Sequence, residues 1–478
     1  MAQVHRKSLV TVGFALVGLG AALTLFLAPP AIVRTGDEVD YLRAASHLAR
    51  HGVFSSAPLS AAAPSRDAYR EPGYPAVLAV AWRLGGVAPP RAEAELRDYR
   101  FEPPARIARL LGGLVLALTA AAAAAAVHAA GGGPAASVAT AALVLASPAL
   151  RQAALSPGSE GLAAALVALF AFAWIRAVTR ASAVLVVIAA VVAGLAPLVR
   201  GATLVLIPIG FGLLLLAPRE LLIGRRLWRA AGFALLAAAP SVVWMTRNLE
   251  ATGSFVLADR GGVVLDARAE LDRQIAHEGL LPAVAAWTPI EAVRRAGERR
   301  WPGATYLRYE WQGGGNFFTR ALRRWQAERR PPADPIAADR RLGREAMREF
   351  VSAPGRHLVA TVAVAWRGLF AERSPEALLP LDLTFVLALL LAGAILRVGW
   401  LALRGRDWAL AAFFIGPAAL FLFHALFTEF LPRFLVPALP LAWGAVCMAL
   451  CGAHLGPRRQ VRQPADASLA RSGRWPDE

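Results

Sequence analysis

Long apolar runs alternate with short polar connections along most of this chain. A helix that crosses the hydrocarbon core of a bilayer needs about 20 apolar residues. Ten segments approach that length, near residues 9–29, 105–127, 134–150, 158–177, 182–198, 201–217, 229–246, 380–397, 407–427 and 432–452. The pattern predicts an all-α polytopic membrane protein with about ten spanning helices, within a range of roughly nine to twelve.

Three apolar segments need a separate interpretation. The first run follows a basic start, as in a signal peptide. It is too long for such a leader and lacks a small-x-small cleavage site, so we expect a retained span. The stretches 73–87 and 356–371 are short and contain Arg83 and Arg367. They are predicted to be helices that lie in the membrane interface.

Composition supports a membrane protein and removes one class of partner. Hydrophobic residues make up 57% of the chain, and the formal net charge is +18. In a soluble protein this charge would indicate nucleic-acid binding, but in a membrane protein it sets topology and attracts anionic lipids. We expect membrane lipids and no nucleic acid as partners. Cys447 and Cys451 lie four residues apart in one apolar segment, which predicts neither a disulfide framework nor a metal cluster.

The basic residues are unevenly divided between the two sets of short loops. About fourteen lie at one set of span ends, and only Arg151, Arg200 and Arg433 lie in the opposite short connections. Because cytoplasmic loops carry the excess of positive charge, both termini are predicted to be cytoplasmic in a cell (inner) membrane. Long loops cross regardless of charge, so the arginine-rich stretch 247–355 is predicted to lie outside.

This orientation places the polar residues near the membrane on the exterior rim. They are Asp37, Arg70, Glu160, Arg247, Glu429 and Arg433. A transporter would be expected to place ionisable groups near the bilayer midplane and to consist of repeated halves. No convincing internal repeat is visible in the sequence.

Four regions follow from the spans. Residues 1–246 form an N-terminal transmembrane module whose first exterior loop is 30–104, and 247–379 form a large exterior lid. Residues 380–456 form the C-terminal spans, and 457–478 form a cytoplasmic tail predicted to be disordered. Within the lid, Trp287, Trp301, Trp311 and Trp325 lie among many arginines. They could bind a sugar or an acceptor, or they could form an interfacial aromatic belt.

The first exterior loop carries the most distinctive pattern. It begins with two acids, Asp37 and Glu38, in TGDEVDYLRAASHLARHG, a predicted amphipathic helix that ends at Gly52. The stretch REPGYPAVLAVAWRLGG follows, in which Pro72 fixes the entry geometry of the next helix. One face of the first helix is predicted to contain Tyr41, Ala45, Leu48 and Ala49.

These two stretches resemble the opening loop of the GT-C membrane glycosyltransferases, in the protein-mannosyltransferase and ArnT-like group (glycosyltransferase family 39-type). Glu71 stands where proline is usual in that group. Four later stretches follow the family's order: SPGSEGLAAAL at 156–166, GLAPLVRGATLVLIP at 194–208, PSVVWMTRNLEATGSFV at 240–256 and FLPRFLVPALPL at 430–441. The resemblance runs from about residue 30 to about residue 445, and the acid-plus-PGYP loop is its most specific part.

The resemblance implies a GT-C-like fold and an inverting sugar transfer. A polyprenyl-phosphate-linked sugar would be the donor, and a lipid, glycan or protein outside the cytoplasm would be the acceptor. Asp37 matches the family's general base, a role that contributes roughly 10²–10⁴-fold to a rate. Asp37 could instead be a helix N-cap. Glu38 could orient the acceptor or simply be a first-turn acid favoured by the helix dipole.

The other candidate site residues divide into two groups. Arg70, Arg247, Arg200 and Arg433 are candidate ligands of the donor phosphate, because the arginine fork fits phosphate oxygens. Tyr41, Tyr74 and Glu160 are candidate substrate-binding residues. Each has a plain alternative, such as a lipid-facing Arg70, a Glu429–Arg433 pair, or Glu160 as a first-turn acid. No spacing of His, Cys or carboxylates predicts a metal site, and no cofactor is predicted.

Two other functions compete with the transferase. The first is a transporter or flippase of lipid-linked glycans, with the exterior acids as gating or binding groups. The second is a membrane scaffold without chemistry, which leaves the acid pair and the PGYP loop unexplained.

Overall fold

Every regular element in the described part of the chain is helical. The computed structural model describes Gly18 and residues 36–97, 103–180, 182–216, 222–308, 315–329, 334–372, 382–405 and 407–450. The predicted first span, Trp311, Cys451 and the polar tail lie outside these residues, apart from Gly18. No strand occurs in the described ranges, which confirms the all-α prediction.

Six helices are long and apolar enough to cross a membrane. They are α5 (Pro103–Ala129), α8 (Glu160–Arg180), α11 (Ile223–Thr252), α18 (Thr384–Gly405), α19 (Trp408–Phe427) and Pro432–Leu450, which joins η4 (Pro432–Ala438) to α20 (Leu439–Leu450). Each coincides with a predicted span. The segments 182–198 and 201–217 also become apolar helices, α9 (Ala183–Val199) and Gly201–Leu216, which is η1 (Gly201–Val205) plus α10 (Leu206–Leu216), but both are shorter. A polytopic membrane fold is therefore confirmed, whereas the count of ten spans stays a prediction.

The segment predicted as one span at 134–150 is broken in the structure. It forms α6 (Pro134–Ala146) and α7 (Pro148–Leu155), which meet at an angle of 56°. Pro148 has no N–H and disfavours helical geometry at the preceding residue, and Ser147 accordingly has φ −57° and ψ 116°. The Ser147 side chain then accepts a hydrogen bond from the Leu150 N–H and caps the new helix.

A buried carboxylate stabilises this break. Glu372 accepts hydrogen bonds from Ser147 Oγ, from the Ala149 N–H at 3.1 Å and from Trp443 Nε1 at 3.3 Å. The first N–H groups of a helix have no partner within the helix, and its N-terminus favours negative charge. Glu372 therefore supports the start of α7 inside the bundle, and α7 leads into the loop 156–159 that reaches the candidate site.

Small residues bring the spanning helices close together. A Cβ on Gly112 of α5 would overlap the carbonyl oxygen of Ala154 at the end of α7. Alanine and glycine line much of the contact between α5 and α8, as is usual where membrane helices approach closely. The bundle is therefore held by close backbone packing rather than by large side chains alone.

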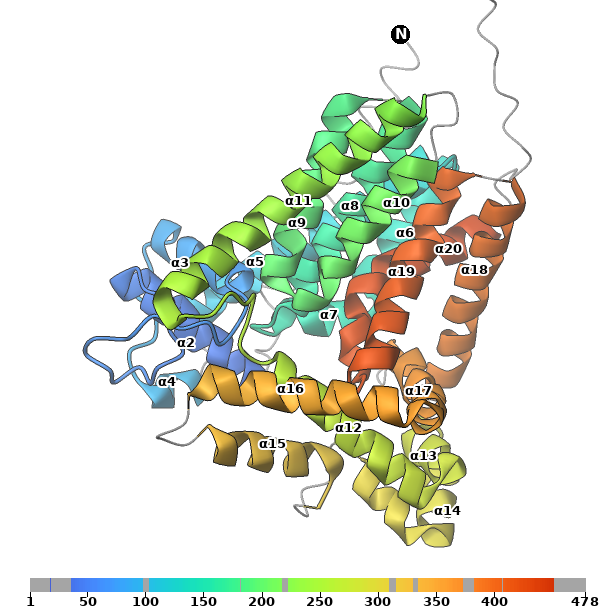
Figure 1. Ribbon diagram of the computed structural model, residues 1–478. Helices are drawn as coiled ribbons and strands as arrows, with labels where there is room; N and C mark the ends of the chain where they lie inside the picture. The colour runs from blue at the N-terminus through green and yellow to red at the C-terminus, as the bar shows by residue number, and fades with distance from the viewer. Residues whose placement is uncertain are drawn as a thin grey trace, which may run out of the picture.

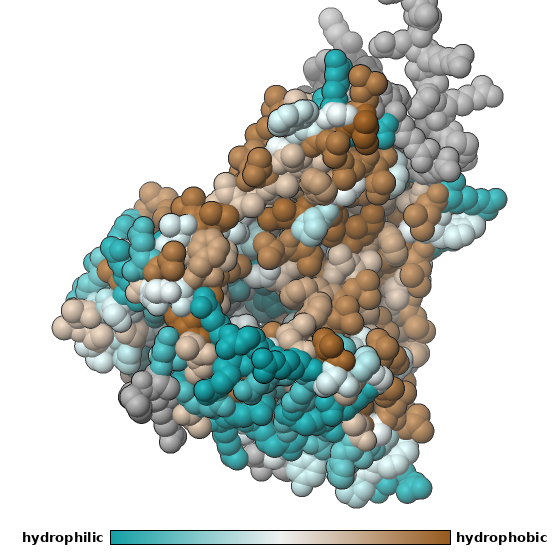
Figure 2. Space-filling model, viewed as in Figure 1, coloured by the Kyte–Doolittle hydropathy of each residue, from teal (hydrophilic) through white to brown (hydrophobic). Residues whose placement is uncertain are grey.

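A layer of helices covers one end of the bundle (Figure 1). We call the helices from residue 261 to 368 the cap: α12 (Gly261–Glu278), α13 (Leu280–Trp287), α14 (Glu291–Arg300), η2 (Pro302–Leu307), α15 (Phe317–Glu328), α16 (Pro335–Ser352) and α17 (Pro354–Gly368). The first loop contributes α2 (Gly36–His51), α3 (Gly73–Leu84) and α4 (Glu93–Arg97) to the same end. Figure 2 shows apolar side chains over the bundle and hydrophilic ones over the cap.

The two predicted interfacial segments are helices, α3 and α17. Val80 and Leu84 of α3 and Leu358 and Val362 of α17 expose apolar side chains, as a helix in the interface would. Arg367, in contrast, is buried. The position of both helices at a membrane surface stays a prediction.

Candidate active site

The acids of the first loop lie at the start of α2. Asp37 and Glu38 occupy its first turn, where the helix dipole stabilises negative charge. Asp40 follows one turn later and lies on the same face as Asp37. Glu38 is turned away from them and accepts a hydrogen bond from Ser156 Oγ. The helix therefore presents Asp37 and Asp40 in one direction and holds Glu38 against the loop after α7.

Arg70 joins the two aspartates. It donates to Asp37 Oδ1, and to Asp40 Oδ2 from Nη2 at 2.7 Å and Nε at 3.2 Å. Its guanidinium carbon lies 5.4 Å from the centre of the Tyr41 ring and 5.5 Å from that of Tyr69. Such contacts with aromatic faces favour a cation. Arg70 is thus held on several sides at once.

The PGYP element fixes the position of Arg70. A Cβ on Gly73 would lie 2.6 Å from Val199 Cγ2 and 2.8 Å from the Leu198 carbonyl oxygen, so α3 begins in close contact with the end of α9. Glu71, which departs from the family's usual proline, accepts a hydrogen bond from the Gly201 N–H at 3.1 Å. The chain directly after Arg70 is therefore attached to the bundle at the junction of α9 and η1.

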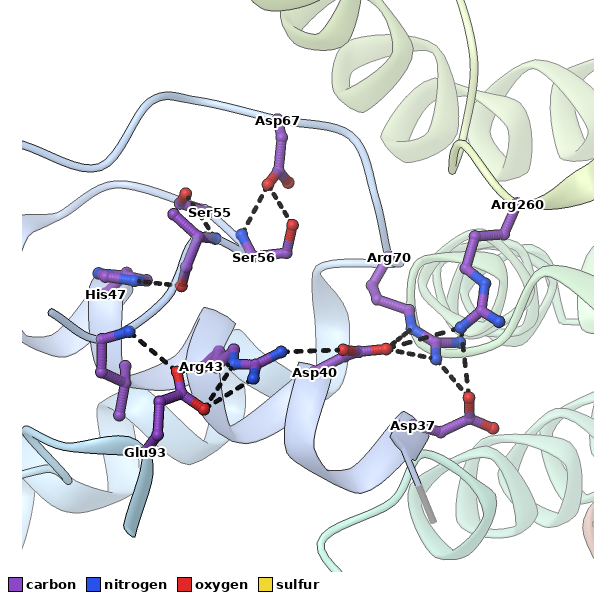
Figure 3. Close-up of polar contacts among 12 residues, drawn as sticks. Asp37, Asp40, Arg43, His47, Ser55, Ser56, Asp67, Arg70, Glu93 and Arg260 are labelled. Atoms are coloured by element: carbon purple, nitrogen blue, oxygen red, sulfur yellow. Dashed lines mark hydrogen bonds and ion pairs between the residues drawn. The ribbon is translucent and has the colours of Figure 1, made fainter. Parts of the chain in front are cut away.

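Two further arginines reach Asp37 from distant parts of the chain. Arg260 precedes α12, and its Nη1 lies 3.3 Å from Asp37 Oδ1 and 3.6 Å from Asp40 Oδ2. Arg433, in η4, donates from Nη2 to Asp37 Oδ2 at 2.6 Å. Figure 3 shows Arg70 and Arg260 directed at Asp37 and Asp40 from different elements. We call Arg70, Arg260 and Arg433 the arginine triad.

The triad determines the charge state of Asp37. Burial acts to raise the pKa of this carboxyl, but the charges of Arg70, Arg433 and Arg260 outweigh burial and hold the pKa well below its ordinary value. Burial alone would also lower the pKa of Arg70, and the nearby Asp37 raises it overall. Asp37 is therefore a stable carboxylate in this arrangement and a weak acceptor of protons.

A second ionic cluster adjoins the first through Arg433. Glu160 Oε1 lies 3.2 Å from Arg200 Nη1 and 3.7 Å from Arg433 Nη1. Arg200 also donates to Ser159 Oγ at 3.2 Å, and the hydroxyl of Tyr41 donates to the same oxygen at 3.2 Å. Four of the predicted site residues, Tyr41, Glu160, Arg200 and Arg433, thus form one connected network with Asp37.

Two buried tyrosines, Tyr41 and Tyr74, pack beside this network. Tyr74 is buried and packs edge-on against Tyr41, with ring centres 5.7 Å apart. Burial raises the pKa of both phenols, and the charge of Glu71 adds to the effect on Tyr41. Both are therefore neutral hydroxyls at any physiological pH.

Arg247 lies in a different environment. Its guanidinium donates to the backbone carbonyls of Asp67 and Phe54 and contacts the Trp244 ring, whose centre is 4.8 Å away. It thereby ties the end of α11 to the first loop. The structure places Arg260, thirteen residues later in the sequence, at Asp37, and the role of Arg247 at a donor phosphate stays a prediction.

Glu429 and His424 are buried near η4. Glu429 precedes the turn that carries Arg433, and burial raises the pKa of its carboxyl. The Glu429 backbone carbonyl accepts a hydrogen bond from Arg367 Nη1 at 3.3 Å. His424 packs against the Phe430 and Phe434 rings.

Two members of the site were not singled out in the sequence, Asp40 and Arg260. Asp40 could have been found, because a residue three positions after Asp37 shares its helix face. Arg260 carries no local signal, since its contact with Asp37 spans 223 residues. Only the folded chain brings them together.

The described residues contain no group of three or more His, Cys, Asp or Glu side chains that could hold a metal ion. The prediction that the protein needs no metal stays a prediction.

No family model matches this sequence, and a search of curated proteins found no match. Among solved structures, the fold is similar to the oligosaccharyltransferase AglB of Archaeoglobus fulgidus in complex with an inhibitory peptide and a dolichol-phosphate (TM-score 0.48, 15% identity, 93% of this chain and 50% of that chain). It is also similar to ArnT from Cupriavidus metallidurans bound to undecaprenyl phosphate (TM-score 0.39, 17% identity, 93% of this chain and 77% of that chain). Both belong to the GT-C superfamily that the first loop resembles. This chain spans about half the length of the oligosaccharyltransferases that it matches.

Proposed function

We propose that this protein is a membrane glycosyltransferase that transfers a sugar from a polyprenyl-phosphate donor to an acceptor outside the cytoplasm. One observation carries the proposal: a carboxylate, Asp37, meets three arginines where an apolar helical bundle joins a hydrophilic cap. A lipid-linked donor is likewise part apolar and part polar, since its lipid chain lies in the membrane and its phosphate and sugar lie at the surface.

The side chains can be assigned roles in an inverting transfer. The arginine triad binds the donor phosphate and stabilises the charge that develops on it as it leaves. Asp37 accepts the proton of the acceptor hydroxyl while the acceptor oxygen bonds to the anomeric carbon. The bond from that carbon to the phosphate oxygen breaks at the same time, and polyprenyl phosphate is the leaving group.

The adjoining residues would position the substrates. Glu160 and Arg200, with the buried tyrosines Tyr41 and Tyr74, form the wall beside Arg433. Glu38, held by Ser156, would orient the acceptor from the other side of α2. The acceptor is a lipid, a glycan or a protein, and the cap is the part of the chain available to select it.

The proposal includes an orientation. The site would face the exterior of a cell (inner) membrane, with both termini in the cytoplasm. Nucleotide sugars are confined to the cytoplasm, which is why a site on the exterior requires a donor that crosses the bilayer with its lipid. The arginine-rich ends of the spans support this orientation.

The test compares purified wild type with Asp37→Asn, using a panel of radiolabelled polyprenyl-phosphate sugars. Asn keeps the size of Asp but cannot take a proton, so loss of the base should lower turnover about 10²–10⁴-fold. Glu291→Gln, which changes an exposed acid on α14, serves as the control and should match wild type. Melting temperatures of the three proteins establish that each is folded.

The outcomes separate the proposal from its rival. Turnover of one donor by wild type and by Glu291→Gln, but not by Asp37→Asn, supports the transferase and identifies the donor. If folded wild type consumes no donor in the panel but moves lipid-linked glycans across proteoliposomes, the protein is a flippase instead. Equal activity of Asp37→Asn and wild type would remove Asp37 from the role of base.

A further inference from the structure

We propose that Arg70, Arg260 and Arg433 form one anion-binding site for which Asp37 and the phosphate group of a lipid donor compete. The inference rests on the proposed function, because it takes the donor to carry a phosphate. It adds a second role for Asp37, as an internal occupant of the phosphate site.

The first support is the number of cations on one carboxylate. Both oxygens of Asp37 are engaged by guanidinium groups, and the three groups come from before α3, before α12 and from η4. A carboxylate has two oxygens, whereas a phosphate presents more oxygens to the surrounding donors. Arginine forks match phosphate geometry well. The triad therefore offers more donors than Asp37 can use.

The second support is that Arg70 and Arg260 have partners other than Asp37. Asp40 lies 2.7 Å from Arg70 Nη2 and 3.6 Å from Arg260 Nη1. The rings of Tyr69 and Trp325 lie 5.2 and 6.0 Å from the Arg260 guanidinium carbon. Arg70 and Arg260 therefore keep their partners and their positions when Asp37 turns away.

The third support is accessibility. The side chain of Asp37 is 32% exposed and that of Arg433 is 31% exposed, whereas Arg260 is 18% and Arg70 is 12% exposed. The Asp37–Arg433 edge is thus the open side of the cluster, and Arg70 forms its inner wall. An incoming phosphate meets the exchangeable carboxylate first and the fixed arginines behind it.

The exchange also explains how a suppressed base can become active. Three arginines keep the pKa of Asp37 low while they contact it. When a phosphate takes the arginines, their charge is neutralised and Asp37 loses the interactions that favour its ionised form. Binding of the donor therefore prepares the base, and an acceptor hydroxyl is not activated before a donor is present.

Arg260 links this exchange to the cap. Its neighbour Asp259 is paired with Arg329 Nη1 at 2.7 Å, and Arg329 stacks on Trp325 with its guanidinium carbon 4.2 Å from the ring centre. Arg329 and Trp325 both lie at the C-terminal end of α15 or directly after it. The anion site is therefore completed by the cap as well as by the bundle.

Direct binding of two probes, farnesyl phosphate and inorganic phosphate, tests the proposal without any sugar transfer. Calorimetry or thermophoresis would give the dissociation constants for wild type, Asp37→Asn, Arg260→Gln and Asp40→Asn. Arg299→Gln, which changes an exposed arginine of α14, is the control for net charge. Melting temperatures again verify folding.

Asp37→Asn should bind farnesyl phosphate about tenfold more tightly than wild type, because a competitor that holds the site about 90% of the time weakens apparent affinity by that factor. Arg260→Gln should bind about tenfold more weakly, the loss of one charge-assisted contact. Asp40→Asn should not bind the probe more tightly, because Asp40 holds Arg70 and Arg260 in place instead of competing with the phosphate. Damage to the fold would not raise affinity.

Several results would overturn the inference. Unchanged or weaker binding by Asp37→Asn would show that Asp37 does not compete with the phosphate. An equal increase in affinity in Asp40→Asn would show that the loss of any nearby negative charge is enough to cause the effect. Unchanged binding by Arg260→Gln would exclude this arginine. If the variants show the expected order of affinities for inorganic phosphate but not for farnesyl phosphate, the site does not accept a lipid phosphate. A failed transfer assay with the expected order of affinities would instead overturn the transferase and leave the anion site in place.

Discussion

Asp259 and Asp37 are two carboxylates paired with different arginines, and their environments shift their pKa values in opposite directions. Asp259 is buried and paired with a single arginine, Arg329. Burial outweighs that pairing and raises the pKa of Asp259 to about 6. At Asp37 three arginines outweigh burial and lower the pKa. The number of cations at each carboxylate, rather than burial alone, decides the outcome.

The raised pKa of Asp259 predicts a pH dependence of stability. The unfolded chain releases this proton near the ordinary pKa of 3.8, and the native protein retains it to about pH 6. Between these values the native state binds more protons, so stability falls as pH rises through this window. Asp259→Asn removes the titration. The melting temperature of wild type should therefore decline relative to that of the variant from pH 4 to pH 6 and run parallel above it.

The control for this experiment is Glu291→Gln, whose exposed side chain should leave the pH profile unchanged. If wild type instead gained stability relative to Asp259→Asn as pH rises, the assignment would be contradicted, since that result requires a lowered pKa.

At the level of single residues, the sequence could identify part of the site. Asp37, Glu38 and Arg70 stand out because charged groups follow an apolar run and precede PGYP. Arg260 does not stand out, because it is one of 51 basic residues and nothing adjacent distinguishes it. Arg247 matched a family stretch, but its position at the end of α11 directs it to backbone carbonyls of the first loop. A local sequence pattern cannot reveal contacts between residues that lie hundreds of positions apart in the chain.

Among the helices, the contact between α5 and α7 offers a direct test of close packing. Gly112→Ala places a methyl group against the Ala154 carbonyl, which cannot move without shifting the loop 156–159. Overpacking of this kind costs about 1–3 kcal/mol. We expect a lower melting temperature in detergent and, through the displaced loop, weaker turnover.

A matched variant is available in α18. A Cβ on Gly393 would meet nothing within 4 Å, so Gly393→Ala adds the same methyl group without a clash. It should leave the melting temperature unchanged or raise it slightly, since Ala favours helix over Gly. Equal losses in the two variants would mean that close packing at Gly112 is not the cause.

The helices themselves were largely predictable, because a span requires a long apolar run that few other structures contain. The break between α6 and α7 was missed. Pro148 was present in the sequence, but prolines also occur inside α9, α11 and α19, and each of those helices continues past its proline. What differs at Ser147 is a tertiary partner, Glu372, from a segment 225 residues away. Proline permits the break, and a distant carboxylate makes it stable.

For the whole molecule, the uneven distribution of arginine predicts the topology. In a background of Cys447→Ser and Cys451→Ser, single cysteines at Gly224, where α11 begins, and at Ala296 on α14 report opposite sides. A membrane-impermeant maleimide should label Ala296→Cys in intact cells and Gly224→Cys only after permeabilisation. Labelling in the reverse order would place the cap and Asp37 in the cytoplasm and would remove the reason for a lipid-borne donor.

More of the overall architecture than of the candidate site could be predicted from the sequence. Hydropathy alone located the six long apolar helices, because burial in lipid constrains composition strongly. The way that the cap sits beside α2 required long-range contacts, such as the Asp259 N–H donating to the Ala68 carbonyl at 2.7 Å. Such contacts depend on geometry that no single segment encodes.

The ion pair between Asp37 and Arg433 joins residues 396 positions apart. A ribosome that adds about 5–20 residues per second needs roughly 20–80 s to make the second partner after the first has emerged. During that interval Asp37 has been synthesised but Arg433 has not. A chain that stops early, or whose final helix fails to insert, consequently carries an incomplete site. The cluster around Asp37 is therefore complete only after η4 has been synthesised.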